Sequence, residues 1–307
     1  MLGCLTEGGQ GLATANNGKY IAIRRSSKWA ANVVKSRPEK LVEAIKQHPA
    51  IINEFLQGQP ADVFTKYSSE QEIIDTFDAI KDKYGRDVFG QGYIFRLIDD
   101  AEIADVDSLT EDEMQNGIDT SKPYYVPYDK GDKDGNRWYL ETPFAIAWSK
   151  ENVRFLKTDP KARFQGSTFF FKEGFCWIFT LNENSEYQKA RYKAKTVNDV
   201  NAMALYTLQG SPLSIKYLVT LFNSYFIFWY KRAFINSTAA FQINDARLIP
   251  VVIPTMEQLN ELEQVFDNAV RTKRKFEDCI ITEEQANTFF AEQQNLIDKI
   301  VSQIYDV

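Results

Sequence analysis

The sequence contains little of what catalytic, metal-binding and membrane proteins commonly use. It has one histidine, His48, and three widely separated cysteines without a Cys-x-x-Cys pair, which predicts neither a zinc site nor a disulfide framework. Its most apolar stretch, residues 217–230, is shorter than the ~20 residues that span a bilayer. The chain does not open on the basic and apolar regions of a signal peptide. These absences predict a cytoplasmic protein without a bound metal ion and without a membrane partner.

The motifs of adenine methylation are missing as well. An adenine methyltransferase holds a flipped base with an Asn/Asp-Pro-Pro-aromatic loop, and the sequence contains no Pro-Pro dipeptide. The glycine-rich stretch 7–11 is similar to a cofactor-binding turn, but only six residues precede it and residues 12–38 contain no acid for a ribose. We therefore expect a loop over residues 7–17, with no catalytic residue and no cofactor in this chain.

The charge of the chain is unevenly distributed, although the net charge is -6. Residues 1–38 carry six bases and one acid, and residues 120–248 carry 18 bases and 11 acids. Residues 39–119 carry seven bases and 19 acids. Exposed charges farther apart than about 10 Å are largely screened, so phosphate binding depends on the local charge. The two basic segments therefore remain candidates for contact with nucleic acid.

Short apolar runs and capping signals together predict an α+β fold with a mixed sheet. The expected strands are 19–24, 144–148, 168–171, 175–180, 202–208 and 248–253. The expected helices begin at the capping signals Ser36–Glu39, Ser69–Glu72, Thr255–Gln258 and Thr282–Gln285, and a buried helix is expected over Ser211–Arg232.

This pattern predicts three parts. Residues 1–38 and 120–254 form a core. Residues 39–119 form an acidic, mainly helical insertion, for which a solvated helical face without function is the simpler interpretation. Residues 255–307 form a helical hairpin, whose apolar stripes serve either packing within the chain or the docking of a partner.

An ordered series of short signatures runs through the two basic segments. They are Gly11–Asn17, Tyr128–Gly131 with Arg137–Tyr139, Phe170–Gly174 with Trp177 and Arg191, Leu221–Ser224, and Leu248–Pro254. The series resembles the target-recognition region of adenine-specific DNA methyltransferases of type IIG restriction-modification and phage-defence systems. Position 15 is alanine where that family often has glycine.

The resemblance implies a module that recognises a DNA sequence and positions double-stranded DNA for a separate methyltransferase domain or subunit. S-Adenosylmethionine would then be bound by that partner and not by this chain. Alternatives are a standalone specificity subunit like those of type I systems, an enzyme with an unrecognised acidic site in residues 99–119, and a protein-interaction module without a DNA role.

Polar and basic side chains in the two basic segments are the candidate DNA contacts. Hydroxyl and amide groups suit phosphates and adenine edges, although residues 14–17 could equally form an ordinary turn. Four bases alternate over residues 189–195, so on a strand they would share one face, either as phosphate contacts or as a solvated edge. The candidates are Thr14, Asn16, Asn17, Lys19, Arg24, Arg25, Lys28, Lys130, Arg137, Lys172, Lys189, Arg191, Lys193 and Lys195.

Overall fold

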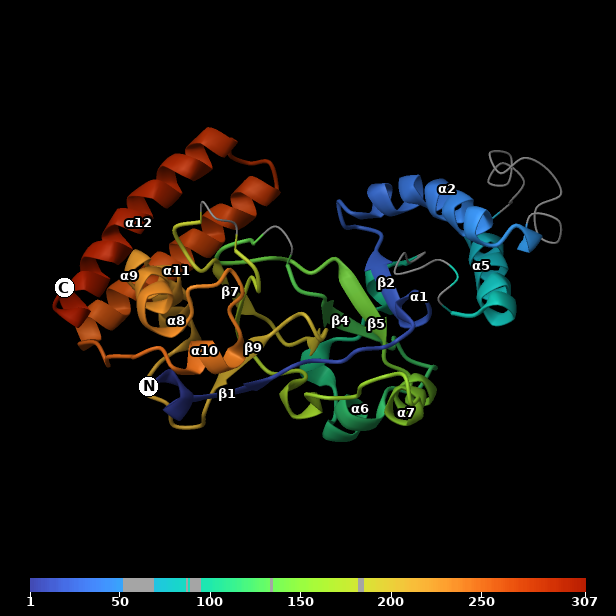
Figure 1. Cartoon of the computed structure of the whole chain (residues 1–307), viewed down its shortest axis with the longest axis horizontal. Helices are drawn as coiled ribbons and strands as arrows, with labels where there is room; N and C mark the ends of the chain where they lie inside the picture. Colours follow the sequence, from blue (N-terminus) through green and yellow to red (C-terminus); the bar gives the residue numbers. More distant parts are fainter. Residues whose placement is uncertain (52–68, 87, 89–94, 133–134, 182–184) are drawn as a thin grey trace. The chain divides into compact units, whose positions relative to one another are not determined.

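The computed structural model describes residues 1–51, 69–86, 88, 95–132, 135–181 and 185–307. In these residues helices and two sheets of short strands form the regular structure, so the fold is α+β, as predicted (Figure 1). The chain divides into two units. Unit 1 comprises residues 1–12, 129–141 and 165–307, and unit 2 comprises residues 13–128 and 142–164. Each unit therefore draws on segments that are far apart in the sequence.

Unit 1 is built on an antiparallel sheet. Its strands follow the order β1 (Thr6–Gly9), β9 (Ala204–Thr207), β6 (Gly174–Trp177) and β7 (Ala190–Lys193). A Cβ at Gly8 would lie 2.4 Å from the carbonyl oxygen of Ala204, so glycine allows β1 to approach β9. The loop predicted over residues 7–17 is therefore wrong at its start, where the glycine-rich stretch is a strand.

Helices pack on this sheet and on one another. Helix α8 (Ile215–Phe222) contacts β6 and β7, and α11 (Met256–Glu277) contacts α8. Helix α12 (Glu283–Tyr305) runs beside α11, and α9 (Tyr225–Tyr230) contacts α12 (Figure 1). Shorter elements are 3-10 helices at Leu2–Cys4 and Ser167–Phe169, strand β8 (Val197–Asn198), a π-helix at Lys231–Ile235 and α10 (Ile243–Arg247).

The core of unit 1 joins the sheet to the two C-terminal helices. Phe175 of β6, Phe222 of α8, Phe266 of α11 and Ile297 of α12 belong to one buried cluster. Full burial of such a side chain is worth about 1.5–3 kcal/mol, so α11 and α12 stabilise unit 1 substantially. Their apolar stripes therefore serve packing within the chain.

Local capping signals explain where α11 and α12 begin. The Thr255 hydroxyl accepts the N–H of Gln258 at 3.3 Å, and the Gln258 amide oxygen accepts the N–H of Thr255 at 3.0 Å. The same reciprocal pair joins Thr282 and Gln285. Both predicted helix starts are confirmed.

Unit 2 contains a second sheet, in which β2 is parallel to β3 and antiparallel to β5. Its strands follow the order β3 (Arg96–Ile98), β2 (Ile21–Arg24), β5 (Phe144–Ala147) and β4 (Tyr125–Asp129). Its helices are α1 (Asn17–Tyr20), α2 (Ala30–Gln47), α5 (Glu70–Tyr84), α6 (Glu111–Asn116) and α7 (Lys150–Thr158), with 3-10 helices at Asp100–Glu102 and Val106–Ser108. Strand β3 lies inside the predicted acidic insertion, which is therefore part of the sheet.

Two capping predictions in unit 2 have opposite outcomes. The Ser69 hydroxyl accepts the N–H of Glu72 at 3.2 Å, so the predicted start of α5 is confirmed. The start predicted at Ser36 is wrong, because α2 already begins at Ala30. The Ser36 hydroxyl donates to the Val33 carbonyl at 3.0 Å, as it does inside a helix, and caps nothing.

Three predictions in unit 1 also need correction. The buried helix of residues 211–232 is interrupted at Asn223 and Ser224, where α8 ends and α9 begins. Residues 168–171 do not form a strand, since a 3-10 helix covers Ser167–Phe169. Residues 248–253 are not a strand either.

The boundaries of the two units differ from the predicted domains. Residues 13–38 belong to unit 2 together with the acidic segment, and the helical hairpin 255–307 belongs to unit 1. In the described part of the chain, no helix combines the length and the apolar character needed to cross a bilayer.

Candidate nucleic-acid interface

A buried ion pair connects two of the signatures in unit 1. Arg191 of β7 donates from Nη2 to both carboxylate oxygens of Asp129, at 2.9 and 3.0 Å. Burial raises the pKa of Asp129, but Arg191 and the N–H of Gly131 outweigh it and hold that pKa below its ordinary value. Burial also opposes the charge of Arg191, and the Asp129 carboxylate nevertheless raises the pKa of Arg191. Both groups are therefore charged at neutral pH.

A second polar cluster joins three more segments of unit 1. Arg137 donates from Nε to the Asn223 side-chain oxygen at 3.2 Å and from Nη2 to the Gln294 side-chain oxygen. The Arg137 guanidinium also lies 4.4 Å from the centre of the Tyr187 ring. Burial lowers the pKa of Arg137 to about 10, which leaves it charged at neutral pH. Through Arg137, the cluster connects Gln294 of helix α12 to Asn223 at the end of helix α8.

Asn223 pairs with the backbone of strand β7 in the way that a neighbouring strand would. Its side-chain oxygen accepts the N–H of Ala190 at 3.0 Å, and its side-chain nitrogen donates to the Ala190 carbonyl at 2.8 Å. Both residues have no exposed surface. The Leu221–Ser224 signature therefore satisfies backbone groups at the edge of the sheet, and Ser224 caps α9 through the N–H of Ile227 at 3.3 Å.

Lys193 is enclosed by backbone carbonyls. Its ammonium donates to the carbonyls of Lys172 and Ala194, both at 2.9 Å, and to the carbonyl of Thr196 at 3.4 Å. The side chain is fully buried, and burial lowers the pKa of Lys193 to about 8. Lys193 therefore holds two loops together and is out of reach of a phosphate.

The predicted row of phosphate contacts over residues 189–195 is thus wrong in its centre. Arg191 and Lys193 share one face of β7, as the alternation predicts, but this face points into unit 1. Arg137 is half-buried, and its guanidinium is engaged within the protein. The side chains of these three candidates form hydrogen bonds within unit 1 and do not form a surface for DNA.

The remaining candidates of unit 1 are more accessible. Lys172 and Lys195 are exposed, and the Lys193 ammonium ties the Lys172 carbonyl to the loop that carries Lys195. Lys130 is half-buried with its ammonium 3.8 Å from the Asp199 carboxylate. Lys189 is half-buried in a left-handed conformation with φ +56° just before β7. Lys172 and Lys195 therefore form the accessible cationic corner of unit 1.

The polar loop of unit 2 forms an internal turn. Thr14 is buried, and its hydroxyl donates to the Asn17 side-chain oxygen at 2.5 Å and accepts the N–H of Asn16 at 3.2 Å. Asn16 and Asn17 are half-buried at the start of α1. The simpler interpretation, an ordinary turn, accounts for all three residues.

The basic candidates of unit 2 lie at its surface. Arg24 and Arg25 pair with Asp100 at 2.9 Å and Asp99 at 3.0 Å, within the acidic segment. Lys28 is exposed. Lys19 is also exposed, and its ammonium lies 5.0 Å from the centre of the Phe155 ring. Exposed ion pairs contribute little to stability, so Arg24 and Arg25 can exchange these partners for phosphates.

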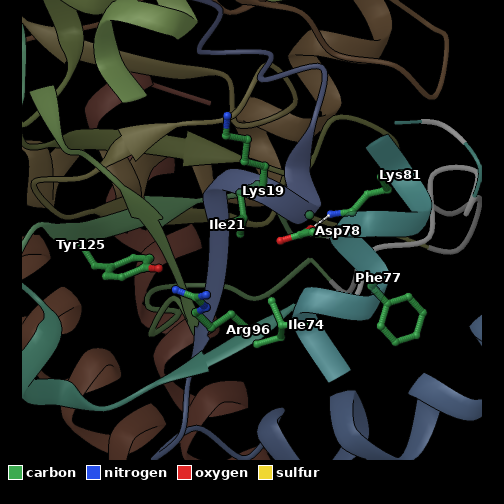
Figure 2. Close-up of a pocket in the computed structure, with 9 residues that line it drawn as sticks. Lys19, Ile21, Ile74, Phe77, Asp78, Lys81, Arg96 and Tyr125 are labelled. Atoms are coloured by element: carbon green, nitrogen blue, oxygen red, sulfur yellow. Dashed lines mark ion pairs between the residues drawn. The ribbon is translucent and has the colours of Figure 1, made fainter. Parts of the chain in front are cut away.

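Two basic residues outside the predicted set line a pocket in unit 2. Lys81 of α5 and Arg96 of β3 face this pocket together with the phenol of Tyr125 (Figure 2). Both bases come from the acidic segment, whose negative net charge gives no indication of a local basic site. A signal was present at Arg96, a base that interrupts the apolar run of residues 93–98.

No catalytic centre is evident in the part of the chain that the structure describes. Burial raises the pKa of the Cys176 thiol to about 12, which disfavours a reactive thiolate. Among the same residues no three His, Cys, Asp or Glu side chains are grouped as a metal site would require.

Comparison with known proteins does not identify a family for this chain. No family model matches it, and no curated protein matches it. The functional interpretation therefore depends on the residues and their geometry.

Proposed function

We propose that the chain is the DNA-recognition module of an adenine-specific DNA methylation or restriction system, positioning duplex DNA for a separate catalytic domain. The observation that carries this proposal is the convergence of signature residues within unit 1. Asp129 bonds to Arg191, and Arg137 bonds to Asn223, although these residues are 62 and 86 positions apart. Residues of three separate signatures thus meet in unit 1, whereas residues 13–17 of the first signature belong to unit 2.

The cationic corner is the part of unit 1 best suited to a phosphate backbone. Lys172 and Lys195 project from loops that the buried Lys193 ammonium fixes. The Lys172 ammonium pairs with the Glu7 carboxylate at 3.7 Å, with both side chains about half exposed. Such a weak pair gives way readily to a phosphate, whose contacts with lysine release counterions.

The test is salt-dependent binding of a DNA duplex by the double variant Lys172→Glu, Lys195→Glu. We expect weaker binding than wild type at low salt, because two phosphate contacts become repulsive. We also expect a flatter plot of log affinity against log salt, by about 0.9 for each lost contact. Fluorescence anisotropy with a labelled duplex at several salt concentrations measures both effects.

A matched control makes the same charge change on the helical hairpin. Lys275→Glu, Lys299→Glu alters two exposed lysines of α11 and α12 and should leave the affinity and the salt slope near the wild-type values. Equal losses in both double variants would mean that net charge alone governs binding. An unchanged titration of the Lys172, Lys195 variant would refute the role of the corner.

If a separate partner carries out the methyl transfer, the chain alone should not bind the methyl donor. The chain alone should show no saturable binding of S-adenosylmethionine at micromolar concentration in calorimetry, because it lacks the base-binding loop and the ribose acid. It should support methylation only when a catalytic methyltransferase partner is supplied in trans. A stoichiometric isotherm for the chain alone would contradict this expectation.

A further inference from the structure

A pocket in unit 2 lies beside helix α5 and strands β2 and β3. Its empty volume is about 450 Å³ including its open mouth. Ile74 and Ile21 supply an apolar part of the lining, and charged groups supply another part (Figure 2). The DNA candidates predicted from the sequence do not account for this pocket, since Lys19 is the only one of them that lines it.

Arg96 is the central cation of the pocket. It is half-buried, and its guanidinium faces the phenol oxygen of Tyr125 (Figure 2). Within the described ranges no carboxylate forms an ion pair with it. Burial lowers the pKa of Arg96, but the Tyr125 phenol and, less strongly, the Asp78 carboxylate outweigh burial and raise that pKa. The guanidinium is therefore charged, and without a paired carboxylate its hydrogen-bond donors can serve an oxyanion ligand.

Lys81 supplies a second cation from α5. Its side chain is 14% exposed, and its ammonium pairs with Asp78, whose side chain is 51% exposed. The absence of a side chain at Gly18 leaves room for this ammonium, since a Cβ there would be 3.4 Å from it. Asp78 is the more solvated partner, so an incoming oxyanion can replace it at modest cost.

The hydroxyl of Tyr125 adds a neutral donor next to Arg96. Burial raises the pKa of the Tyr125 phenol, so its proton is present at neutral pH. The planar guanidinium can donate two parallel hydrogen bonds to one oxyanion, and the ammonium adds a point charge. Arg96 and Tyr125 thus present adjacent donors to an oxyanion, and Lys81 adds a second positive charge from another side of the same pocket (Figure 2).

We propose that this pocket binds a phosphate-class oxyanion through Arg96, Lys81 and the Tyr125 hydroxyl. The inference does not depend on DNA recognition by the cationic corner of unit 1. The phosphoryl group can belong to a small phosphorylated molecule or to a DNA backbone, and the two sources share the same recognition chemistry.

The test uses the full chain and titrates it with inorganic phosphate at constant ionic strength, with chloride as the reference anion. Wild type should give a saturable isotherm and a rise in melting temperature that chloride does not produce. Arg96→Gln should weaken phosphate binding about tenfold or more, and Arg96→Lys should restore part of it, because the charge returns without the bidentate fork. Lys81→Gln provides an independent variant on the surface helix α5 if Arg96→Gln does not fold.

The control is Lys83→Gln, an exposed lysine of the same helix that does not line the pocket, and it should bind phosphate as wild type does. A duplex titration of the same variants distinguishes the sources. Loss of phosphate binding alone indicates a small phosphorylated ligand, and loss of duplex binding, with or without free phosphate, indicates a DNA phosphodiester. If Arg96→Gln or Lys81→Gln changes neither, or if wild type binds neither ligand saturably, the pocket is not an oxyanion site.

Discussion

Replacing Arg191 by leucine is expected to destabilise the protein by about 3–5 kcal/mol. The substitution leaves the Asp129 carboxylate buried without its cation, since Arg191 donates to both of its oxygens. Urea-induced unfolding followed by tryptophan fluorescence measures the loss as a lower midpoint at an unchanged slope.

A double variant separates an unpaired charge from a simple packing defect. Arg191→Leu combined with Asp129→Asn removes the stranded charge and keeps an acceptor for the N–H of Gly131, which lies 3.0 Å from Asp129. It should recover more than half of the lost stability. If the double variant is as unstable as Arg191→Leu, the loss comes from packing and not from the buried charge.

A solvent-exposed ion pair in the same unit provides the matched control. Lys216 donates to Asp267 at 2.7 Å, with 43% and 46% of the two side chains exposed. Lys216→Leu should change the free energy of unfolding by less than about 1 kcal/mol. If Arg191→Leu and Lys216→Leu lose a similar free energy of unfolding, burial does not determine how much each ion pair contributes to stability.

The pH dependence of stability follows from the same pair. The pKa of Asp129 is lower in the folded protein than in the unfolded chain, so its contribution is present above the unfolded pKa near 4 and is lost as pH falls through the folded pKa. In Arg191→Leu the lowering guanidinium is gone, and burial raises the pKa of Asp129. In the variant, the ionisation of Asp129 should therefore no longer raise the free energy of unfolding as pH increases. The difference in that free energy between wild type and variant should become smaller in acid.

The alternating bases of strand β7 show what a sequence pattern can and cannot determine. A period of two correctly predicts that Arg191 and Lys193 share a face, because successive side chains of a strand point in opposite directions. It does not reveal which face is buried. The interior partners of these bases, Asp129 and the carbonyl of Lys172, are distant in sequence, so only the tertiary structure places the bases inside.

Helix starts were predictable where the signal is local and complete. At Thr255 and Thr282 the hydroxyl accepts the backbone N–H of the glutamine three residues later, and the glutamine side-chain oxygen accepts the backbone N–H of the threonine. No tertiary contact is needed. At Ser36 the same pattern lies inside a helix that already began at Ala30. A capping pattern competes with a preceding helical turn, and here the longer helix prevails.

The segment 248–253 fails as a strand because of its surroundings. Pro250 within the segment cannot donate a hydrogen bond to a sheet, and Pro254 directly follows the segment. Tyrosine hydroxyls satisfy its carbonyls instead, Tyr305 at the carbonyl of Pro250 (2.8 Å) and Tyr217 at the carbonyl of Val252 (3.0 Å). An apolar β-branched run therefore indicates neither a strand nor burial by itself, since Ile249 is buried whereas Leu248, Val252 and Ile253 are exposed.

The candidate interface was only partly predictable for a related reason. The exposed Lys172 and Lys195 were within the predicted set, Lys195 as one of the four alternating bases of residues 189–195. Arg96 and Lys81 were missed because the net charge of their segment is strongly negative. Net charge is a property of a whole segment, whereas a pocket is lined by single residues from several segments, so the net charge of one segment does not predict the charge of the pocket.

Replacing Asn223 by alanine is expected to destabilise the protein by about 2–4 kcal/mol. Its amide satisfies the N–H of Ala190, and it also accepts from Arg137 at 3.2 Å. Without it, the buried N–H of Ala190 loses its acceptor, whereas the Ala190 carbonyl keeps the N–H of Trp138 at 2.9 Å. Urea unfolding measures the loss. The control Asn295→Ala, at an exposed position of α12, should be neutral or slightly stabilising because alanine is the better helix former.

Asn223→Asp distinguishes the accepting oxygen of the side-chain amide from its donating NH2 group. The carboxylate still accepts from Ala190 and Arg137, but it can no longer donate to the carbonyls of Ala190 and Val219, which lie 2.8 and 3.0 Å from the amide nitrogen. These carbonyls would instead face a negative oxygen, so this variant should also be less stable than wild type. Stability equal to wild type would mean that the donor half of the amide is dispensable.

Duplex binding decides whether Asn223 also reads DNA. The residue has no exposed surface, so the folded Asn223→Ala variant, measured below its melting temperature, should bind duplex with the wild-type salt slope. Lost binding in a variant of unchanged stability would instead indicate direct contact with DNA after a local opening. With reduced stability and retained binding, the Asn-Ser signature acts by joining helix α8 to the edge of the sheet, and exposed residues such as Lys172 carry the DNA contacts.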